Sequence, residues 1–437
     1  MSYPEVDGGF SWNGAGSCKD AQIHRHTQTF GVDFGADKQL GVIQRADPDE
    51  GRRGWGDVHV QGAVIFRRAG PGTPDSAITL EVTVTDDRLT LYSSWDAEAG
   101  ALDIVVPRKV DWSPDHPRAC ANIKITVWVP QDSTLARLSV NAVHLGITLL
   151  DNLSLTVLEG SKLTSTVGTI TSSSTGAASR DDDHLKTSPP PQTAYLFHSR
   201  IIDVRTTAAP IKGVWPLYDY LGLQSTAGNI RVSVTPHPGL PDTPKPAILY
   251  VKSLSGDVEV REPVRSTDSL PARDYRVDVH TTSGDITAAV AFASAAGFKS
   301  TSGNVKLELL PVLEVATEAR LSTGSTSGDT EVVVLEPLWV AADDDEGRVL
   351  RSLNSTHGST SGNVKARYPG SWEGDISLAS LSGRLSVGGK GVKLIKAGGE
   401  WPGVKKGLVA RKGEKGEGGE IVVKTTSGDV DVLVGEK

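Results

Sequence analysis

The sequence is poor in aromatic residues and methionine, and it shows almost no helical periodicity. Aromatic residues make up 5% of the 437 residues, and one methionine stands against 47 glycines. Hydrophobic residues still reach 38%, so the core must be built from Val, Ile, Leu and Ala. Apolar residues show no sustained i, i+3, i+4, i+7 spacing, which an amphipathic helix requires. We therefore expect an all-β chain with thin stacked layers.

Long apolar runs and a basic charge balance are also missing. No stretch reaches the ~18 apolar residues that span a bilayer, and the start MSYPEVDGGFSWNG has no apolar signal-peptide core. The formal net charge is −8, so no basic surface is implied that would neutralise the phosphates of a nucleic acid. We predict no nucleic-acid partner and no membrane span. The protein is either extracellular or at the cell surface, its signal or anchor being absent from this chain, or cytoplasmic.

Cysteines are scarce as well, with only Cys18 and Cys120. Two are too few for a disulfide scaffold and show no zinc-ligand spacing. They form one disulfide if the chain is exported, or they stay two free thiols. Because the P-loop, dinucleotide and His-Glu-x-x-His motifs are missing too, we expect no cofactor and no metal site.

The sequence is rich in one repeat, for which KSTSGNVKLELL (299–310) is an example. Gly can adopt the unusual backbone angles of a sharp corner, and the Asp or Asn beside it can bond its own backbone. Most copies are about 20–35 residues apart, which is the range of solenoid repeats. The predicted corner glycines are Gly228, Gly256, Gly284, Gly303, Gly328, Gly362, Gly383 and Gly428.

Apolar and polar residues alternate after each corner. Val305, Leu307 and Leu309 would face a core, while Lys306 and Glu308 would face water, since strand side chains alternate. If each repeat is one rung, rungs stack ~4.8 Å apart and their apolar columns fuse. No like charges are neighbours in the outward column, which favours stacking in this order. That column comprises Arg231, Glu259, Thr287, Lys306, Glu331, Lys365, Ser386 and Asp431.

We therefore predict a right-handed parallel β-solenoid (β-helix) with a β-rich N-terminal cap. Polar, Gly-rich composition marks an arm, alternating stretches mark the cap, and Pro-, Gly- or charge-rich stretches mark loop insertions. The predicted divisions are the arm at 1–54, the cap at 55–130 and the solenoid at 131–437, with insertions at 171–193, 236–246, 341–358 and 396–420.

The repeated [ST]-x-S-G-[DN]-[VI]-x-[VLA] pattern resembles the putative adhesin domain family over roughly residues 130–437. The closing KTTSGDVDVLVG (424–435) matches the usual family ending, and the segment from Cys120 to Pro130 is similar to filamentous-fungal members. Those members often carry an N-terminal transmembrane anchor that this chain lacks. The resemblance implies a β-solenoid of mostly unknown function, and it brings no catalytic residues.

Two sets of residues are candidates for a functional site. Asp257 and Asp285 are adjacent acids of the corner column, and their carboxyls could lie near the ~5 Å separation of retaining glycosidases. The alternative is that both only build corners. Trp215, Tyr218 and Tyr220 interrupt the repeat and could stack on sugar rings, as could Trp372. The alternative for these rings is a hydrophobic plug over a side or an end of the solenoid.

These observations favour a non-enzymatic, adhesin-like protein of the cell surface or cell wall. It would bind a cell-wall polysaccharide or a surface protein through its solenoid faces and insertion loops. A polysaccharide hydrolase or lyase of the β-helix type is the second hypothesis, and a structural spacer is the third. Converging carboxylates and aromatics in a groove would favour the enzyme, whereas a flat ladder of Thr, Ser, Lys and Glu would favour binding.

Overall fold

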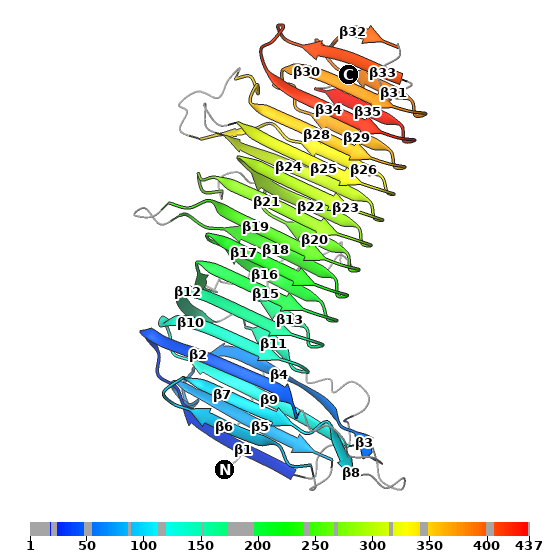
Figure 1. The fold of residues 1–437 in the computed structure, drawn as a ribbon. Coiled ribbons are helices and arrows are strands. Elements are labelled where there is room, and N and C mark those ends of the chain that lie inside the picture. The colour runs from blue at the N-terminus through cyan, green and yellow to red at the C-terminus, as the bar shows by residue number, and fades with distance from the viewer. Residues whose placement is uncertain are drawn as a thin grey trace, which may run out of the picture.

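The computed structural model describes residues 18, 24–47, 55–85, 89–111, 119–150, 153–172, 196–239, 244–265, 270–313, 318–340, 348–398 and 406–435. These residues form an elongated stack of β-strands, with the N-terminal region at one end and the C-terminal region at the other (Figure 1). All regular elements in these ranges are strands, and no helix that could span a membrane occurs among them. The predicted all-β solenoid is confirmed.

Two large sheets, mostly parallel, make up the stack. Sheet A contains, in spatial order, β1 (His24–Gly31), β5 (Ala77–Val84), β9 (Cys120–Val129), β4 (His59–Arg68), β11 (Gly146–Leu149), β13 (Ile170–Ser172), β16 (Ile211–Leu217), β18 (Ile230–Pro236), β20 (Val258–Arg261), β22 (Ile286–Phe292), β24 (Val305–Leu313), β26 (Thr330–Val334), β29 (Val364–Tyr368), β35 (Val430–Val434) and β31 (Leu385–Gly388). The short β27 (Leu338–Trp339) pairs with β24.

Sheet B faces sheet A across the core. Its pairings give the order β6 (Tyr92–Asp96), β7 (Ala101–Val106), β2 (Gly35–Ala46), β10 (Ser133–Ala142), β12 (Ser154–Ser165), β14 (Leu196–Ser199) with β15 (Ile201–Thr206), β17 (Tyr220–Ser225), β19 (Ala247–Ser253), β21 (Tyr275–Thr281), β23 (Ala295–Ser300), β25 (Ala319–Ser325), β28 (Leu353–Ser359), β34 (Gly419–Thr425), β30 (Gly374–Ser380), β33 (Lys406–Lys412) and β32 (Lys393–Ala397). A separate antiparallel pair joins β3 (Trp55–Asp57) and β8 (Lys109–Asp111).

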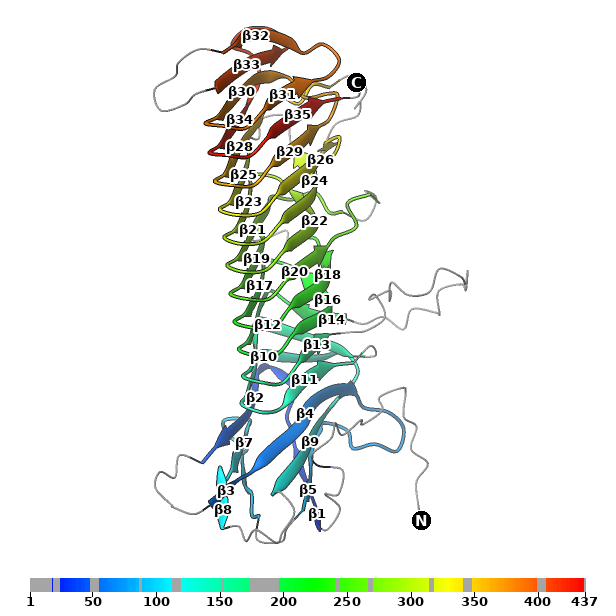
Figure 2. The ribbon, with the colours of Figure 1, turned by 90° about the vertical axis from the view of Figure 1, so that its right-hand side faces the viewer.

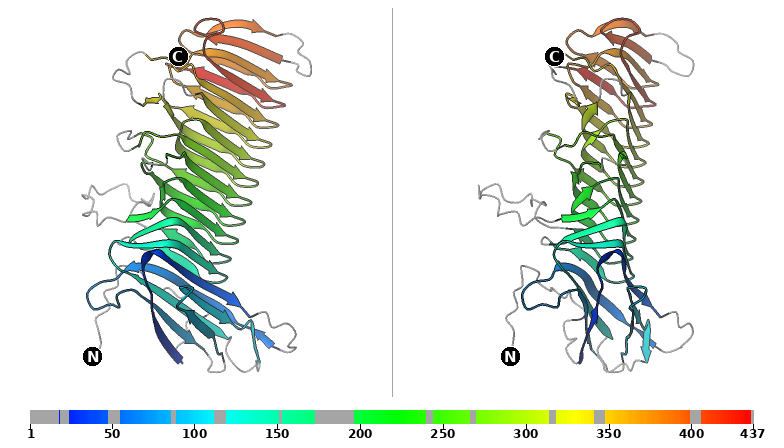
Figure 3. Two further views of the ribbon diagram at one scale, coloured as in Figure 1. Left: turned by 60° about the vertical axis from the view of Figure 1, so that its left-hand side comes forward. Right: turned by 90° about the vertical axis from the view of Figure 1, so that its left-hand side faces the viewer.

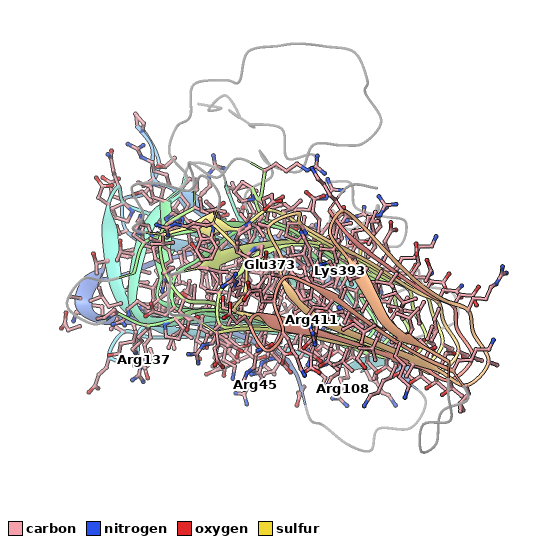
Figure 4. The ribbon with its side chains drawn as sticks, turned by 90° about the horizontal axis from the view of Figure 1, so that it is seen from above. Arg45, Arg108, Arg137, Glu373, Lys393 and Arg411 are labelled. Atoms are coloured by element: carbon pink, nitrogen blue, oxygen red, sulfur yellow. A yellow bond between two sulfur atoms is a disulfide. The ribbon has the colours of Figure 1, made fainter. Side chains whose placement is uncertain are left out.

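Each repeat forms one rung, which is a strand of sheet B, a sharp corner and a strand of sheet A (Figure 2). In the rung of β23 and β24, Val305, Leu307 and Leu309 are at most 2% exposed, and Lys306 faces solvent. The predicted alternation is therefore correct. Seen along the axis, the stack is flattened between two broad faces, and Arg45 and Arg137 project from the sheet B face (Figure 4).

The last rung in sequence is not the last in space. The strand β35 pairs with β29 on one side and β31 on the other, and β34 lies between β28 and β30. The predicted order of corners is therefore wrong at its end, because Gly428 lies between Gly362 and Gly383. Lys365 consequently faces Asp431 and not Ser386, which brings opposite charges together.

The N-terminal end shows the same kind of insertion. The strand β2 pairs with both β7 and β10, and β4 pairs with both β9 and β11. Antiparallel strands then border both ends, with β1, β5 and β6 at one end and β33 and β32 at the other. Residues 35–46 and 59–68 are therefore integrated into the stack. A disulfide joins Cys18 and Cys120 next to it, with a Cα–Cα distance of 5.7 Å.

The predicted domain divisions stay predictions, and the strands cross several of them. The strands β1 and β2 of the predicted arm lie in the two large sheets. The strand β28 begins within the predicted insertion at 341–358, and β33 lies wholly within the one at 396–420. Residues 173–193 of the first insertion lie outside the described residues.

Candidate functional site

The corners stack in a row along one edge of the solenoid (Figure 3). A buried Ser or Thr lies three residues before each glycine. At six of the eight corners its hydroxyl accepts a hydrogen bond from the glycine N–H, whereas Thr425 Oγ1 donates to Gly428 O at 2.8 Å. Ser300 Oγ accepts from Gly303 N at 2.9 Å. Matching bonds occur at Gly228, Gly256, Gly284, Gly362 and Gly383. The first [ST] of the repeat is therefore a buried acceptor that closes the corner.

A second set of hydrogen bonds runs from rung to rung through the Asp and Asn side chains. Asp285 Oδ1 accepts from the backbone N–H of Asn304 at 2.7 Å, and Asn304 Oδ1 accepts from Asp329 N at 3.0 Å. The same bond links Asn229 to Asp257, Asp257 to Asp285, Asp329 to Asn363, Asn363 to Asp429 and Asp429 to Arg384. The side chains bond the next rung, and not their own backbone as predicted. Arg384 is the last of these corner residues in space. Its side chain therefore does not have to accept a hydrogen bond from a further rung of this ladder.

Asp257 and Asp285 lie on successive rungs, as predicted, since their following residues Val258 and Ile286 are paired. Both side chains are exposed at the corner, and Asp285 N donates to Asp257 Oδ1 at 3.1 Å. The ladder accounts for both acids, so the geometry adds no support to a glycosidase pair.

The corner glycines are needed for close approach between rungs. None of the eight has a φ in the left-handed region, contrary to the predicted reason. A Cβ at Gly303 would lie 1.9 Å from Gly284 O. At the other corners, the added atom would lie 1.9–2.3 Å from the carbonyl oxygen of the adjacent rung. Any side chain would therefore push the rungs apart.

The tryptophans predicted to bind sugar are part of the core. Trp215 and Trp372 are fully buried, and their indole N–H groups donate to Lys212 O at 3.0 Å and to Leu353 O at 3.4 Å. Neither ring has a face open to a ligand, which corrects the prediction. The segment 213–222 does not interrupt the repeat either, because β16 and β17 pair with the rungs on both sides.

Tyr218 belongs to a polar cluster at the turn between β16 and β17. Its hydroxyl lies 2.6 Å from His198 Nδ1, and its ring stacks on His237 at 4.4 Å. Burial lowers the pKa of His198 and brings the pKa of His237 to about 4, while it raises the pKa of Tyr218. Burial thus moves the pKa values of all three groups away from neutral pH, where general acid–base catalysis works best. Tyr220 lies half-buried in β17.

A groove on the outer face of sheet B was not predicted. Its volume is about 850 Å³, and its walls come from β19, β21, β23, β25, β28, β34 and the corners that follow them. We call it the sheet B groove. One column of paired residues crosses it, comprising Lys252, His280, Lys299, Gly324, Gly358 and Lys424. A second row contains the exposed threonines Thr282, Thr301, Thr326, Thr360 and Thr426.

The two glycines of this column produce the hollow. Three copies of the repeat have Lys252, Lys299 or Lys424 before the buried Ser or Thr, whereas the two GSTSG copies have Gly324 and Gly358 there. The missing side chains leave the sheet bare between Lys299 and Lys424. Glycine at this position in two neighbouring copies is the signal by which the sequence could have indicated the groove. Among the described residues, no cluster of three or more His, Cys, Asp or Glu could hold a metal.

Comparison with known proteins bears on the C-terminal rungs. Residues 240–433 match the sequence model of the Toastrack DUF4097 family. The matched region contains the strands that line the sheet B groove. The family match gives no indication of filamentous-fungal origin. No curated protein matches the chain.

Two solved structures are distantly similar. A putative cell adhesion protein from Clostridium sporogenes ATCC 15579 is 6% identical, with 94% of this chain and 99% of that chain covered and a TM-score of 0.15. A putative lipid binding protein from Parabacteroides distasonis ATCC 8503 is 11% identical, with 78% and 96% covered and a TM-score of 0.29. At these scores neither structure carries an argument about function.

Proposed function

We propose that the protein is a non-enzymatic, adhesin-like protein of the cell surface that holds an extended glycan in the sheet B groove. The observation that carries this proposal is the course of the groove across six successive strands. Strands are ~4.8 Å apart, so the groove extends roughly 24 Å along the solenoid axis. The rung spacing is close to the length of one sugar ring in an extended chain. An extended polysaccharide would thus place about one sugar residue opposite each rung of the groove.

The chemistry of the groove suits sugar hydroxyls. The threonine row offers hydroxyls that both donate and accept, and the lysines add donors. Tyr250 is half-buried at one end, where its ring could pack against a sugar. No Asp or Glu lines the groove among the described residues, so it lacks the two carboxylates of a glycosidase. This composition supports binding over hydrolysis.

The remaining parts of the proposal are the partner and the place of action. A cell-wall polysaccharide fits the groove better than a folded surface protein, because the threonines that line the groove recur from rung to rung. The Cys18–Cys120 disulfide supports an extracellular location, since disulfides persist in oxidising compartments. The similarity to filamentous-fungal members belongs to the same proposal. A hydrolase or lyase based on Asp257 and Asp285 is the alternative.

A glycan array, combined with a polysaccharide-degradation screen on the full chain, tests the proposal. We expect retention of at least one extended polysaccharide without release of reducing ends. Gly358→Tyr should abolish retention by filling the groove, and it should fold, since the nearest heavy atom to the new Cβ is Thr323 O at 3.9 Å. Thr287→Tyr, at an exposed position of sheet A, is the matched control. Release of sugar products would overturn the non-enzymatic function.

A further inference from the structure

We propose that the ligand of the sheet B groove is anionic, specifically a polysaccharide that carries carboxylates. This inference rests on the proposed function and adds the chemical class of the glycan. It starts from the lysines of the groove, Lys252, Lys299 and Lys424. All three are exposed, and none forms an ion pair within the described part of the chain.

The positive charge of the groove is unbalanced in a protein whose net charge is −8. Cross-strand neighbours of the three lysines are uncharged or are the imidazole of His280. His280 itself is occupied, because its Nε2 lies 2.6 Å from Asp278 Oδ1. The groove therefore presents three cations with no carboxylate among its lining residues.

Sheet A shows the opposite arrangement. Lys306 and Lys365 both lie beside Glu331, and Lys365 also lies beside Asp431. Each lysine of that column thus has an acidic neighbour within reach across the strands. Lysines of the sheet A column thus have an acid directly opposite them, whereas the residues directly opposite the groove lysines carry no carboxylate. An anion from outside the chain is the complement that the groove lacks.

The spacing of the lysines fits a polymer better than a small anion. Lys299 and Lys424 are three rungs apart, or roughly 14 Å, with Gly324 and Gly358 between them. A chain lying on the two glycines could reach a lysine with a carboxylate at each end, while its hydroxyls meet the threonine row. Lys424 completes this arrangement only because β34 is inserted between β28 and β30.

Carboxylate sugars suit this groove better than nucleic acid does. A lysine ammonium group is a compact point charge, so it can donate hydrogen bonds to carboxylates that approach in varied orientations. The net charge of −8 opposes the long-range attraction on which proteins that bind nucleic acid depend.

Binding of polygalacturonate and of its fully methyl-esterified form tests the inference, since the two share one backbone. We expect the full chain to bind the acid form, to lose affinity as salt is raised, and to bind the ester at least about tenfold more weakly. Lys299→Gln and Lys424→Gln should each weaken binding of the acid form by about tenfold, and Lys424→Arg should retain it. Lys306→Gln, on sheet A, is the control and should leave affinity unchanged.

The outcomes separate the two proposals. Equal binding of the acid and the ester would overturn the anionic class and leave the glycan-binding function standing. Failure to bind any polysaccharide would overturn both. Unchanged affinity in the folded Lys299 and Lys424 variants, as checked by far-UV circular dichroism, would show that the groove lysines do not hold the ligand. Equally tight binding of single-stranded DNA would also refute the inference.

Discussion

Replacing Gly303 with alanine tests whether the corners depend on close approach between rungs. The new Cβ would lie 1.9 Å from Gly284 O and 2.5 Å from Gly284 C. Both are backbone atoms, so no side-chain rotation can relieve the contact. Carbon atoms pack best at about 3.5–4.0 Å, so the two rungs must separate by about 1 Å or more.

This separation would stretch the hydrogen bonds that link the two rungs. Ser302 N donates to Thr282 O at 2.9 Å, and Asn304 N donates to Asp285 Oδ1 at 2.7 Å. At about 1 kcal/mol for each lost bond, together with overpacking, we expect the free energy of unfolding to fall by about 2–4 kcal/mol.

Gly324→Ala is the matched control, because it changes the same residue type one rung away. Its nearest new contact is Lys299 Cγ at 3.7 Å, which is an ordinary distance, and its φ is not left-handed. Stability should change by less than about 1 kcal/mol, in the stabilising direction, because alanine restricts the unfolded chain. Urea denaturation measures both variants, and amide hydrogen exchange at Ser302 and Asn304 shows whether the loss is local. Equal stability of the two variants would refute the close-approach argument.

Three further predictions concern the ladder and the buried ionisable groups. Asp329→Ala removes the acceptor of Asn363 N and should cost about 1 kcal/mol, seen as faster exchange of that amide, whereas Arg384→Ala at the end of the ladder should change little. Burial lowers the pKa of His357 from 6.5 to about 4, so the unfolded chain binds more protons between these values. Stability should then fall as pH drops from 6.5 through 4, and His357→Gln should flatten that decline in thermal unfolding if the variant folds. Burial raises the pKa of Glu262 from 4.5 to about 8, so stability should fall as pH rises through this interval, and a Glu262→Gln variant with the same decline would contradict the assignment.

Local features of the sequence predicted the rung correctly. The alternation at Val305 to Leu309 depends only on the two-residue period of a strand, which any sheet imposes. A Ser or Thr three residues before a glycine marked each of the eight corners. The physical cause assigned to the glycine was wrong, however, because both a left-handed φ and a close approach to another backbone favour glycine. Only the distance to the neighbouring rung separates these causes.

The candidate site was predicted poorly. Trp215 and Trp372 are rare residues in a sequence poor in aromatics, and rarity suggested function. Their inward positions on the rungs instead make them core side chains. The sheet B groove was missed because it arises from Gly324 and Gly358, where side chains are absent, and from neighbours on other rungs.

The sequence by itself determined the all-β class, the places of the corners and which face of each strand is buried. These properties follow from backbone sterics and from alternation within a few residues. The tertiary structure decided which rungs are neighbours, since every rung offers similar edges for hydrogen bonding and the sequence does not state which edge the final segment meets. The insertion of β34 and β35 settled this choice. It placed Asp431 beside Lys365 in sheet A, and it placed Lys424 at the end of the sheet B groove.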